Sequence, residues 1–514
     1  MKYQNPILHG MYPDPSIVLV DDTYYLVNST FEYYPGIALS KSKDLVNWER
    51  MPGIAKSPKQ ADLRTSKSNE GIFAVCIRHY EGHFYVVTTN FAEFKTFIIR
   101  GTFNEDKSAI IWENDRVEVN VMGIDPDLYF EDGRTYLQFT GYIDDKGTKA
   151  IQQVEINLED GKILRGPEVI AFGTGGRDVE GPHILKQKGY YYLLTAEGGT
   201  GQGHMVTMFR SKELWGPYEN EVGVNPLFTN RDRAEQPLQN IGHSDLFQDV
   251  NGNWWLVCLG TRPANVGFSQ ITNIGRETLL YPVDWSGIWP KIYKGVPEKE
   301  VDLTDFPEHA KTIGVQASAD FEDDFKDGLK NDWLTLRDSL KDKLQVKDGL
   351  LELYGQEKKL SELGTPSFVG LRQADHEEVL TVEVSEETDL KEGAAGIVSL
   401  INVDHYAGLI LKKTEQGYDL YRLQQVADVV VNQKVGHLTS LPEKLELINS
   451  AATKTFTAYA KEQKVSFEMA AINLSNEALA ALNTGDIEGL FAYGNAKLTV
   501  TKVKREVNAD VESK

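Results

Sequence analysis

Residues 243–257 read HSDLFQDVNGNWWLV, and they are the last of five related stretches that decide the fold. The others are DPSIVLVDDTYYLV at 14–27, AVCIRHYEGHFYVV at 74–87, DPDLYFEDGRTYLQF at 125–139 and EGPHILKQKGYYYLL at 180–194. Each joins a small or polar first residue to a short apolar strand, a turn and an aromatic-rich strand. An aromatic residue stands eleven positions after each start, at Tyr25, Tyr85, Tyr136, Tyr191 and Trp254. This constant register predicts one structural unit repeated five times.

The spacing of the repeats indicates the architecture. Their starts are separated by 60, 51, 55 and 63 residues, and turn signals such as Asp-Gly and Gly-Asn recur between short alternating strands. Each unit holds about four such strands, and helical periodicity is hard to find in any of them. Five copies of this unit predict a five-bladed β-propeller. A β-sandwich with as many strands is the structural alternative, but it does not predict the constant register.

The remainder of the chain has a different composition. Seven of the eight Trp and sixteen of the 23 Tyr precede residue 290, and a polar stretch without periodic signal follows. From Phe321 the chain reads FEDDFKDGLKNDWLTLRD and continues in short alternating strands, which is typical of a β-sandwich. We therefore predict an all-β protein with a propeller at 1–295, a linker at 296–320 and a sandwich domain at 321–514.

Charge and composition restrict the partners. The chain of 514 residues carries a net charge of −22, which repels polyanions and argues against nucleic acid and anionic membrane surfaces as partners. No apolar run approaches the roughly 18 residues that span a bilayer, and MKYQNPILHGMYPDPS does not read as a signal peptide. A cytoplasmic protein is the expectation. The only cysteines, Cys76 and Cys258, lie in strand-like runs and are expected to be buried free thiols.

The first residues of the five repeats carry the chemistry. In a propeller the innermost strands start at one face around a central channel, so equivalent residues converge. These positions hold Asp14, Ala74, Asp125, Glu180 and His243. Taken singly, each polar residue reads as a turn former, a loop residue or a satisfied interior histidine. Three carboxylates at one axis, however, raise one another's pKa at a cost in stability, which favours a functional role. A protonated and an ionised carboxyl group together are typical of glycoside hydrolysis.

The motifs around these residues carry a family resemblance. NPILHGMYPDPSIV, GIDPDLYF, VEGPHIL, TAEGGT, IGHSDLF and NIGRETLLYPVDW occur in this order in the N-terminal part. Together they resemble glycoside hydrolase family 43, whose five-bladed propeller enzymes remove xylosyl or arabinofuranosyl units. FEDDFKDGLKNDWLTLR resembles the start of the concanavalin-like β-sandwich attached to the β-xylosidase and α-arabinofuranosidase branch.

The resemblance implies roles for four residues. Asp14 in PDPS matches the general base that activates water, and Glu180 in EGPH matches the general acid that protonates the leaving oxygen. Asp125 in DPDL matches the third carboxylate, which tunes and orients the acid. Arg276 in GRET resembles the arginine that binds sugar hydroxyls, although without the resemblance it would read as a surface loop residue. Inversion at the anomeric carbon by direct water attack is implied as well.

The resemblance also implies how the sugar is held. Phe31 and Phe73 fall where aromatic walls of the sugar pocket are expected, with core packing as the competing interpretation, and Thr200 falls on a loop that reaches the substrate. His243 resembles an axial histidine that in many family members touches a Ca²⁺ or its waters in the channel. No set of ligands at metal spacing supports this independently. No cofactor is expected to be required, and a Ca²⁺ in the channel would be structural or would sharpen the electrostatics of the site.

The substrate prediction is an exo-acting α-L-arabinofuranosidase on arabino- or arabinoxylo-oligosaccharides. Phe-Ala-Val-Cys at 73–76 replaces the Trp-Ala-Pro-Asp of many relatives, which points towards a branch richer in arabinofuranosidases. A β-D-xylosidase on xylo-oligosaccharides, or an enzyme with both activities, is the alternative. A non-catalytic carbohydrate-binding propeller is the remote alternative, since interaction propellers rarely place three acids at the axis. The sandwich domain is expected to close the rim of the site and to contribute contacts in a homo-oligomer.

Overall fold

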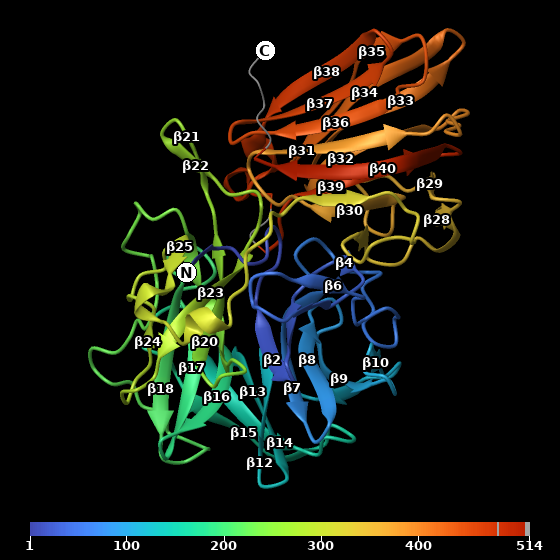
Figure 1. Ribbon diagram of the computed structural model, residues 1–514. Coiled ribbons are helices and arrows are strands. Elements are labelled where there is room, and N and C mark those ends of the chain that lie inside the picture. The colour runs from blue at the N-terminus through green and yellow to red at the C-terminus, as the bar shows by residue number, and fades with distance from the viewer. Residues whose placement is uncertain (481–482, 509–514) are drawn as a thin grey trace.

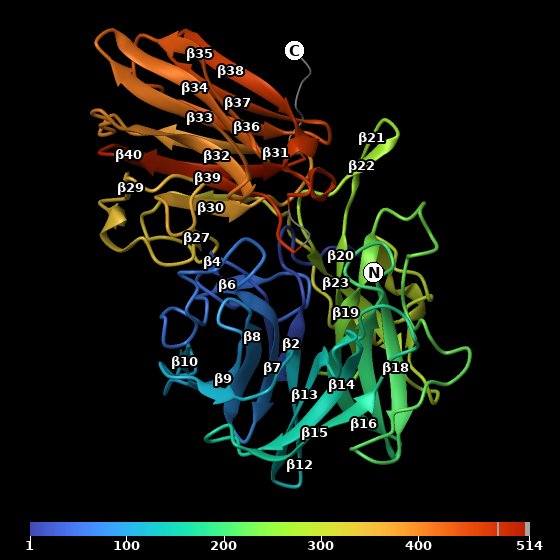
Figure 2. The same cartoon turned by 180° about the vertical axis from the view of Figure 1, so that it is seen from behind.

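The computed structural model describes residues 1–480 and 483–508 as two β-structures joined end to end (Figure 1). The N-terminal part is a ring of sheets, and the C-terminal part is a pair of packed sheets. Figure 2 shows from behind that strand β4 (Tyr33–Tyr34) of the first part lies next to β27 (Thr335–Leu336) of the second. These residues include no helix with the length and apolar composition of a membrane span.

The ring consists of five separate antiparallel sheets, which confirms the predicted five-bladed propeller. Each sheet begins with the strand nearest the axis, and these inner strands are β2, β7, β12, β16 and β19. The blades contain the following strands: β2 (Ser16–Val20), β3 (Thr23–Asn28), β5 (Ala38–Ser42) and β6 (Glu49–Met51); β7 (Ile72–Tyr80), β8 (His83–Asn90), β9 (Lys95–Phe103), β10 (Ile110–Trp112) and β11 (Val117–Val119); β12 (Ile124–Glu131), β13 (Arg134–Tyr142), β14 (Lys149–Ile156) and β15 (Ile163–Ala171); β16 (Glu180–Gln187), β17 (Tyr190–Glu197) and β18 (Met205–Ser211); β19 (Gln239–Gln248), β20 (Trp254–Thr261), β23 (Glu277–Asp284) and β24 (Lys291–Ile292).

The aromatic residues of the repeat hold neighbouring blades together. Each lies within the first three residues of the second strand of its blade, shortly after the turn that joins this strand to the inner strand. The Tyr25 ring packs 5.1 Å from Phe84 of the next blade, and the Tyr85 ring packs 5.7 Å from Phe130 of the blade after that. Such contacts bury large apolar area between sheets that share no backbone hydrogen bonds, which explains why the register is constant.

The inner strands are irregular where they begin. Bulges interrupt the pairing of β7, β12, β16 and β19 within their first residues. Asp14, Asp125 and His243 have φ values of 51°, 54° and 42°, a left-handed conformation that few residues other than glycine adopt. Bulges and such strained backbone are frequent beside functional sites, where they redirect side chains. Asp14, Asp125, Glu180 and His243 lie in or just before these irregular strand starts.

The C-terminal part is a β-sandwich, as predicted. Its core lies between the sheets and is dominated by buried Leu, Val, Ala and Phe side chains. One sheet contains β26 (Phe321–Asp323), β28 (Leu344–Lys347), β29 (Leu350–Tyr354), β31 (Glu378–Val384), β36 (Lys444–Asn449), β37 (Thr453–Ala460), β38 (Gln463–Ala470) and β40 (Lys497–Val507). The other contains β30 (Phe368–Arg372), β32 (Ala394–Asn402), β33 (His405–Thr414), β34 (Gly417–Val426), β35 (Val429–Leu438) and β39 (Ile487–Tyr493).

The two parts are joined by more than the chain. Within residues 296–320, predicted as a linker, β25 (Glu300–Asp302) pairs with β1 (Lys2–Gln4) at the start of the propeller. The same stretch contains two 3₁₀ turns, η1 (Leu303–Asp305) and η2 (His309–Lys311). Met11 and Tyr33 of the propeller are buried in an apolar cluster with sandwich residues such as Leu336 and Phe368. The remaining short elements are the hairpin β21 (Ala264–Val266) and β22 (Ser269–Ile271), and the turns η3 (Lys341–Lys343), η4 (Ala471–Leu474) and η5 (Asn476–Ala478).

Candidate active site

Asp14 lies at the centre of a polar cluster where the inner strands begin. Its side chain is buried, and the Ser29 hydroxyl donates a hydrogen bond to Oδ2. The Arg276 guanidinium donates from Nη1 to Asp14 Oδ1 at 3.1 Å, and His243 Nδ1 lies 3.7 Å from the same oxygen. The first and last blades therefore meet at this carboxylate.

Arg276 connects several parts of the site. It directly precedes β23, and its buried guanidinium also donates to Thr200 Oγ1 at 3.2 Å and to the Asn483 carbonyl oxygen at 3.1 Å. Its Cζ lies 5.5 Å from the centre of the Phe31 ring. The structure thus brings together Asp14, Arg276, Thr200 and Phe31, four of the predicted site residues.

Asp125 and Glu180 lie side by side on the third and fourth blades. The backbone N–H of Gly181 donates to Asp125 Oδ2 at 3.2 Å, so the start of β16 is held against the start of β12. Asp125 is buried, whereas the Glu180 side chain keeps some exposure. Near Glu180, Lys149 and Asp178 form an ion pair at 2.6 Å. All three predicted carboxylates therefore face the same end of the channel.

The environments of the carboxyl groups push their pKa values apart. Burial raises the pKa of Glu180, and the negative charge of Asp125 raises it further, to about 8. Burial also acts to raise the pKa of Asp14, but Arg276, His243 and the Ser29 hydrogen bond outweigh it and hold that pKa below its usual value. Burial raises the pKa of Asp125, against the opposing effect of His243. At neutral pH the site holds a protonated Glu180 and an ionised Asp14.

Aromatic side chains line the site beside Arg276. The Phe31 and Phe73 rings lie 5.6 Å apart, and Phe73 is stacked on Phe91 at 4.5 Å with nearly parallel planes. Phe31 is buried, as its core-packing interpretation expects, but Phe73 and Phe91 are only half-buried. Half-buried, rigidly stacked rings offer a flat apolar surface of the kind on which a sugar ring packs.

Comparisons with known proteins agree with this geometry. A family model described as glycosyl hydrolases family 43 matches residues 3–290. The chain belongs to this family. A second model, described as the β-xylosidase C-terminal concanavalin A-like domain, matches residues 322–504 of the family 43 chain. Both matches confirm the resemblance seen in the sequence, and the enzyme is a glycosidase of arabinofuranosyl or xylosyl linkages with oligosaccharide substrates.

Several relatives match this family 43 enzyme over most of their length. It is 34% identical to a non-reducing end α-L-arabinofuranosidase of Bacteroides ovatus, over 96% of this chain and 92% of the relative. It is 33% identical to a xylosidase/arabinosidase of Butyrivibrio fibrisolvens, over 96% of each chain. The solved structure of GH43B from the xyloglucan PUL of Bacteroides ovatus matches with a TM-score of 0.86 at 30% identity, covering 99% of this chain and 100% of that one.

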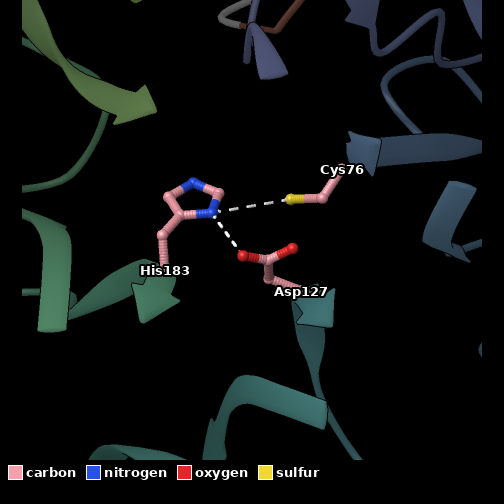
Figure 3. Close-up of side chains that lie close together, drawn as sticks. All are labelled: Cys76, Asp127 and His183. Carbon is pink, nitrogen blue, oxygen red and sulfur yellow. Dashed lines mark hydrogen bonds and ion pairs between the residues drawn. The ribbon is translucent and has the colours of Figure 1, made fainter. Parts of the chain in front are cut away.

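A second polar layer fills the axis two to four residues further along the inner strands of the family 43 propeller. Figure 3 shows Cys76, Asp127 and His183 pointing towards one another, with His183 Nδ1 at 2.8 Å from Asp127 and 3.9 Å from the Cys76 sulfur. The Arg78 guanidinium enters this group, 2.6 Å from Asp127 Oδ2 and 2.9 Å from His183 Nδ1. It also pairs with Asp245 at 2.8 Å. Arg78, which lies on β7, thus connects its own inner strand with β12, β16 and β19.

This second layer does not fit Ca²⁺. Calcium takes six to eight oxygen ligands, whereas these side chains offer a thiol, an imidazole and carboxylates already bound by Arg78. Burial raises the pKa of the Cys76 thiol well above its usual value, which makes it a poor ligand as well. His243 belongs to no group of three close His, Cys, Asp or Glu donors in the described part of the chain. Its role as a metal ligand stays a prediction.

Several site residues escaped the sequence interpretation. Ser29, Lys149 and Asp178 lie outside the repeat starts, and no motif singled them out. Asn483 reaches Arg276 from the other domain through a backbone carbonyl, which leaves no signature in side-chain identity. Phe91, which directly follows β8, meets Phe73 across the β7–β8 hairpin, and no motif singled it out either.

Proposed function

We propose that this enzyme is an exo-acting, inverting α-L-arabinofuranosidase. The observation that carries the proposal is that the pKa values of two carboxyl groups in one site are shifted in opposite directions. Glu180, with its pKa raised to about 8, keeps a proton to donate, while Asp14 stays ionised beside Arg276. This is the division of roles that an inverting glycosidase needs.

In the proposed reaction, Glu180 transfers its proton to the glycosidic oxygen as the bond to the anomeric carbon breaks. Asp14 removes a proton from a water molecule, and the water oxygen attacks the anomeric carbon from the opposite face. Asp125 holds the start of β16 through Gly181 and raises the pKa of Glu180 by its charge. Arg276 orients Asp14, and together with Thr200 it binds hydroxyl groups of the terminal sugar.

The choice of arabinofuranoside is supported by two observations. One is Phe-Ala-Val-Cys at 73–76, and the other is the similarity to the arabinofuranosidase of Bacteroides ovatus over nearly the whole chain. The Butyrivibrio fibrisolvens relative is named for both sugars, which supports a β-D-xylosidase, or an enzyme with both activities, as the second candidate.

Turnover of nitrophenyl α-L-arabinofuranoside and nitrophenyl β-D-xylopyranoside distinguishes the candidates. We expect the higher kcat/KM on the arabinofuranoside, and a hundredfold preference for the xyloside would overturn that choice. The roles are tested by Glu180→Gln and Asp14→Ala. Glu180→Gln should retain activity only on substrates with good leaving groups, and Asp14→Ala should be inactive on every substrate. Undiminished hydrolysis of an oligosaccharide by Glu180→Gln would refute the assigned acid.

A further inference from the structure

The sandwich domain contacts the active site through two buried cations, Lys454 and Arg372. Neither touches the carboxylates that we assign to the reaction. Each instead holds a short stretch of the propeller that carries one member of the Asp14–Arg276 pair.

Lys454 lies at the centre of a fully buried polar cluster where the two sheets of the sandwich meet. Its Nζ donates to Gln373, Asn449 and Glu488 at 2.8–2.9 Å and pairs with Asp486 Oδ2 at 2.9 Å. A buried ammonium with four acceptors is costly to desolvate and is justified energetically only when its geometry is well satisfied. The cluster is therefore a rigid anchor for Asp486, the residue before β39.

Asp486 connects the Lys454 cluster to the propeller by hydrogen bonds. Its backbone N–H donates to the Asn273 carbonyl oxygen at 2.8 Å, and Asn273 Nδ2 donates to Asp486 Oδ2 at 3.2 Å. The neighbouring Gly485 packs so closely on Ile274 that an added Cβ would lie 2.1 Å from the Ile274 carbonyl oxygen. Three residues after Asn273 comes Arg276, whose Nη2 donates to the Asn483 carbonyl oxygen at 3.1 Å.

Arg372 holds the other member of the pair. Its Nε donates to the Met11 carbonyl oxygen at 2.7 Å, and its Nη1 donates to the Tyr12 hydroxyl at 3.1 Å. Its Cζ also lies 4.1 Å from the centre of the Tyr12 ring. Tyr12 is two residues before Asp14, and its backbone N–H donates to the Arg276 carbonyl oxygen at 2.9 Å. Both stretches are thus held to each other and to the sandwich.

We propose that Lys454 and Arg372 are positioning residues that set the geometry of the Asp14–Arg276 pair, so that the sandwich is part of the catalytic apparatus. This inference rests on the proposed function, because it assigns the pair a catalytic role. A shift of the pair by about 1 Å is enough to reduce turnover about 100-fold. A side chain that is separated from the Asp14–Arg276 pair by other residues can therefore affect the rate without touching substrate.

The test compares Lys454→Met, Arg372→Met and Asn273→Ala with the wild-type enzyme. Asn273→Ala removes the side-chain hydrogen bond to Asp486 and keeps the backbone one, and it leaves every charge of the Lys454 cluster paired, so it serves if either charge-removing variant fails to fold. The matched control is Phe456→Leu, which enlarges a cavity in the sandwich core on the same strand as Lys454. All are assayed below their melting temperature for kcat, KM and the pH profile of kcat/KM.

We expect the folded test variants to lose about tenfold or more in kcat/KM and to move the acid limb of the pH profile upward. Phe456→Leu should lower the Tm with an unchanged profile. If the test variants behave like Phe456→Leu while Arg276→Met is impaired, the positioning inference fails alone. If Arg276→Met also leaves kcat/KM and the profile unchanged, the catalytic role that the proposed function gives to the Asp14–Arg276 pair fails with it.

Discussion

The ion pair between Arg276 and Asp14 makes a prediction about the acid side of the pH profile. Asp14 must be ionised to remove a proton from water, so activity falls as the pH drops through its pKa. Arg276 holds that pKa below its usual value against the opposing effect of burial. Replacing Arg276 with Met keeps a similar apolar volume and removes the charge, so the pKa of Asp14 should rise and the acid limb should move to higher pH.

The size of the shift follows from the distance. Unit charges 3.1 Å apart attract by about 5 kcal/mol at an effective dielectric constant of about 20. Water that enters the space left by the guanidinium offsets part of this, and His243 and the Ser29 hydrogen bond continue to stabilise the ionised form. We therefore expect a shift of about 1–3 pH units, the range typical of an aspartate beside an arginine.

The assay is kcat/KM against pH with a nitrophenyl glycoside, whose good leaving group makes the rate insensitive to Glu180. Thr200→Val is the matched control, since it removes another hydrogen bond of Arg276 without changing any charge. It should alter KM and leave the acid limb in place. An Arg276→Met enzyme that loses activity with its acid limb at the wild-type pH would refute the reasoning, because Asp14 would then not be the group that Arg276 keeps ionised.

Three further predictions concern other parts of the molecule. With an oligosaccharide substrate, kcat/KM should fall above about pH 8 as Glu180 loses its proton, and this limb should disappear in Glu180→Gln; a limb that persists in the variant belongs to another group. Arg78→Met leaves Asp127 and Asp245 buried without their cation and should lower the free energy of unfolding by about 3–5 kcal/mol in chemical denaturation. A free energy of unfolding that stays unchanged in Arg78→Met would contradict this role of the cation. Gly485→Ala should destabilise the protein by about 1–3 kcal/mol and lower kcat, since its Cβ would overlap the Ile274 carbonyl; wild-type kinetics would contradict the packing.

The repeat register predicted the fold because it reports a physical contact. The rings of Tyr25 and Tyr85, on the second strands of their blades, pack against the next blade, which fixes their position relative to the inner strand. The same register predicted the axial residues, since it fixes where each inner strand begins. Asp14, Asp125 and Glu180 do lie together at one end of the channel, with Asp14 and Asp125 in the left-handed conformation.

The surroundings of these carboxylates could not be predicted in the same way. Lys149 approaches Glu180 from the preceding blade and pairs with Asp178, two residues before Glu180, and neither position follows the repeat. The contact from Asn483 comes through a backbone carbonyl 207 residues from Arg276, and any amino acid supplies a carbonyl. Nothing in the sequence distinguishes Lys454 from a solvated lysine, because its burial depends on which sheets of the sandwich meet.

The two layers of the axis show how one repeat produces carboxyl groups with different protonation states. Two residues along β19 from His243, Asp245 is as buried as the upper carboxylates, yet Arg78 and His183 outweigh burial and lower its pKa to about 2. Burial alone would raise the pKa of every carboxyl group in the channel. What separates Asp14 and Asp245 from Glu180 is a guanidinium within hydrogen-bond distance, from Arg276 in the upper layer and Arg78 in the lower. No arginine pairs with Glu180 among the described residues, and its nearest charged neighbours include the carboxyl group of Asp125. Among the described residues the general acid is therefore distinguished by the absence of an arginine partner, because the ammonium group of Lys149, which acts to lower its pKa, is paired with Asp178. An arginine placed beside Glu180 would abolish proton donation while leaving the fold intact.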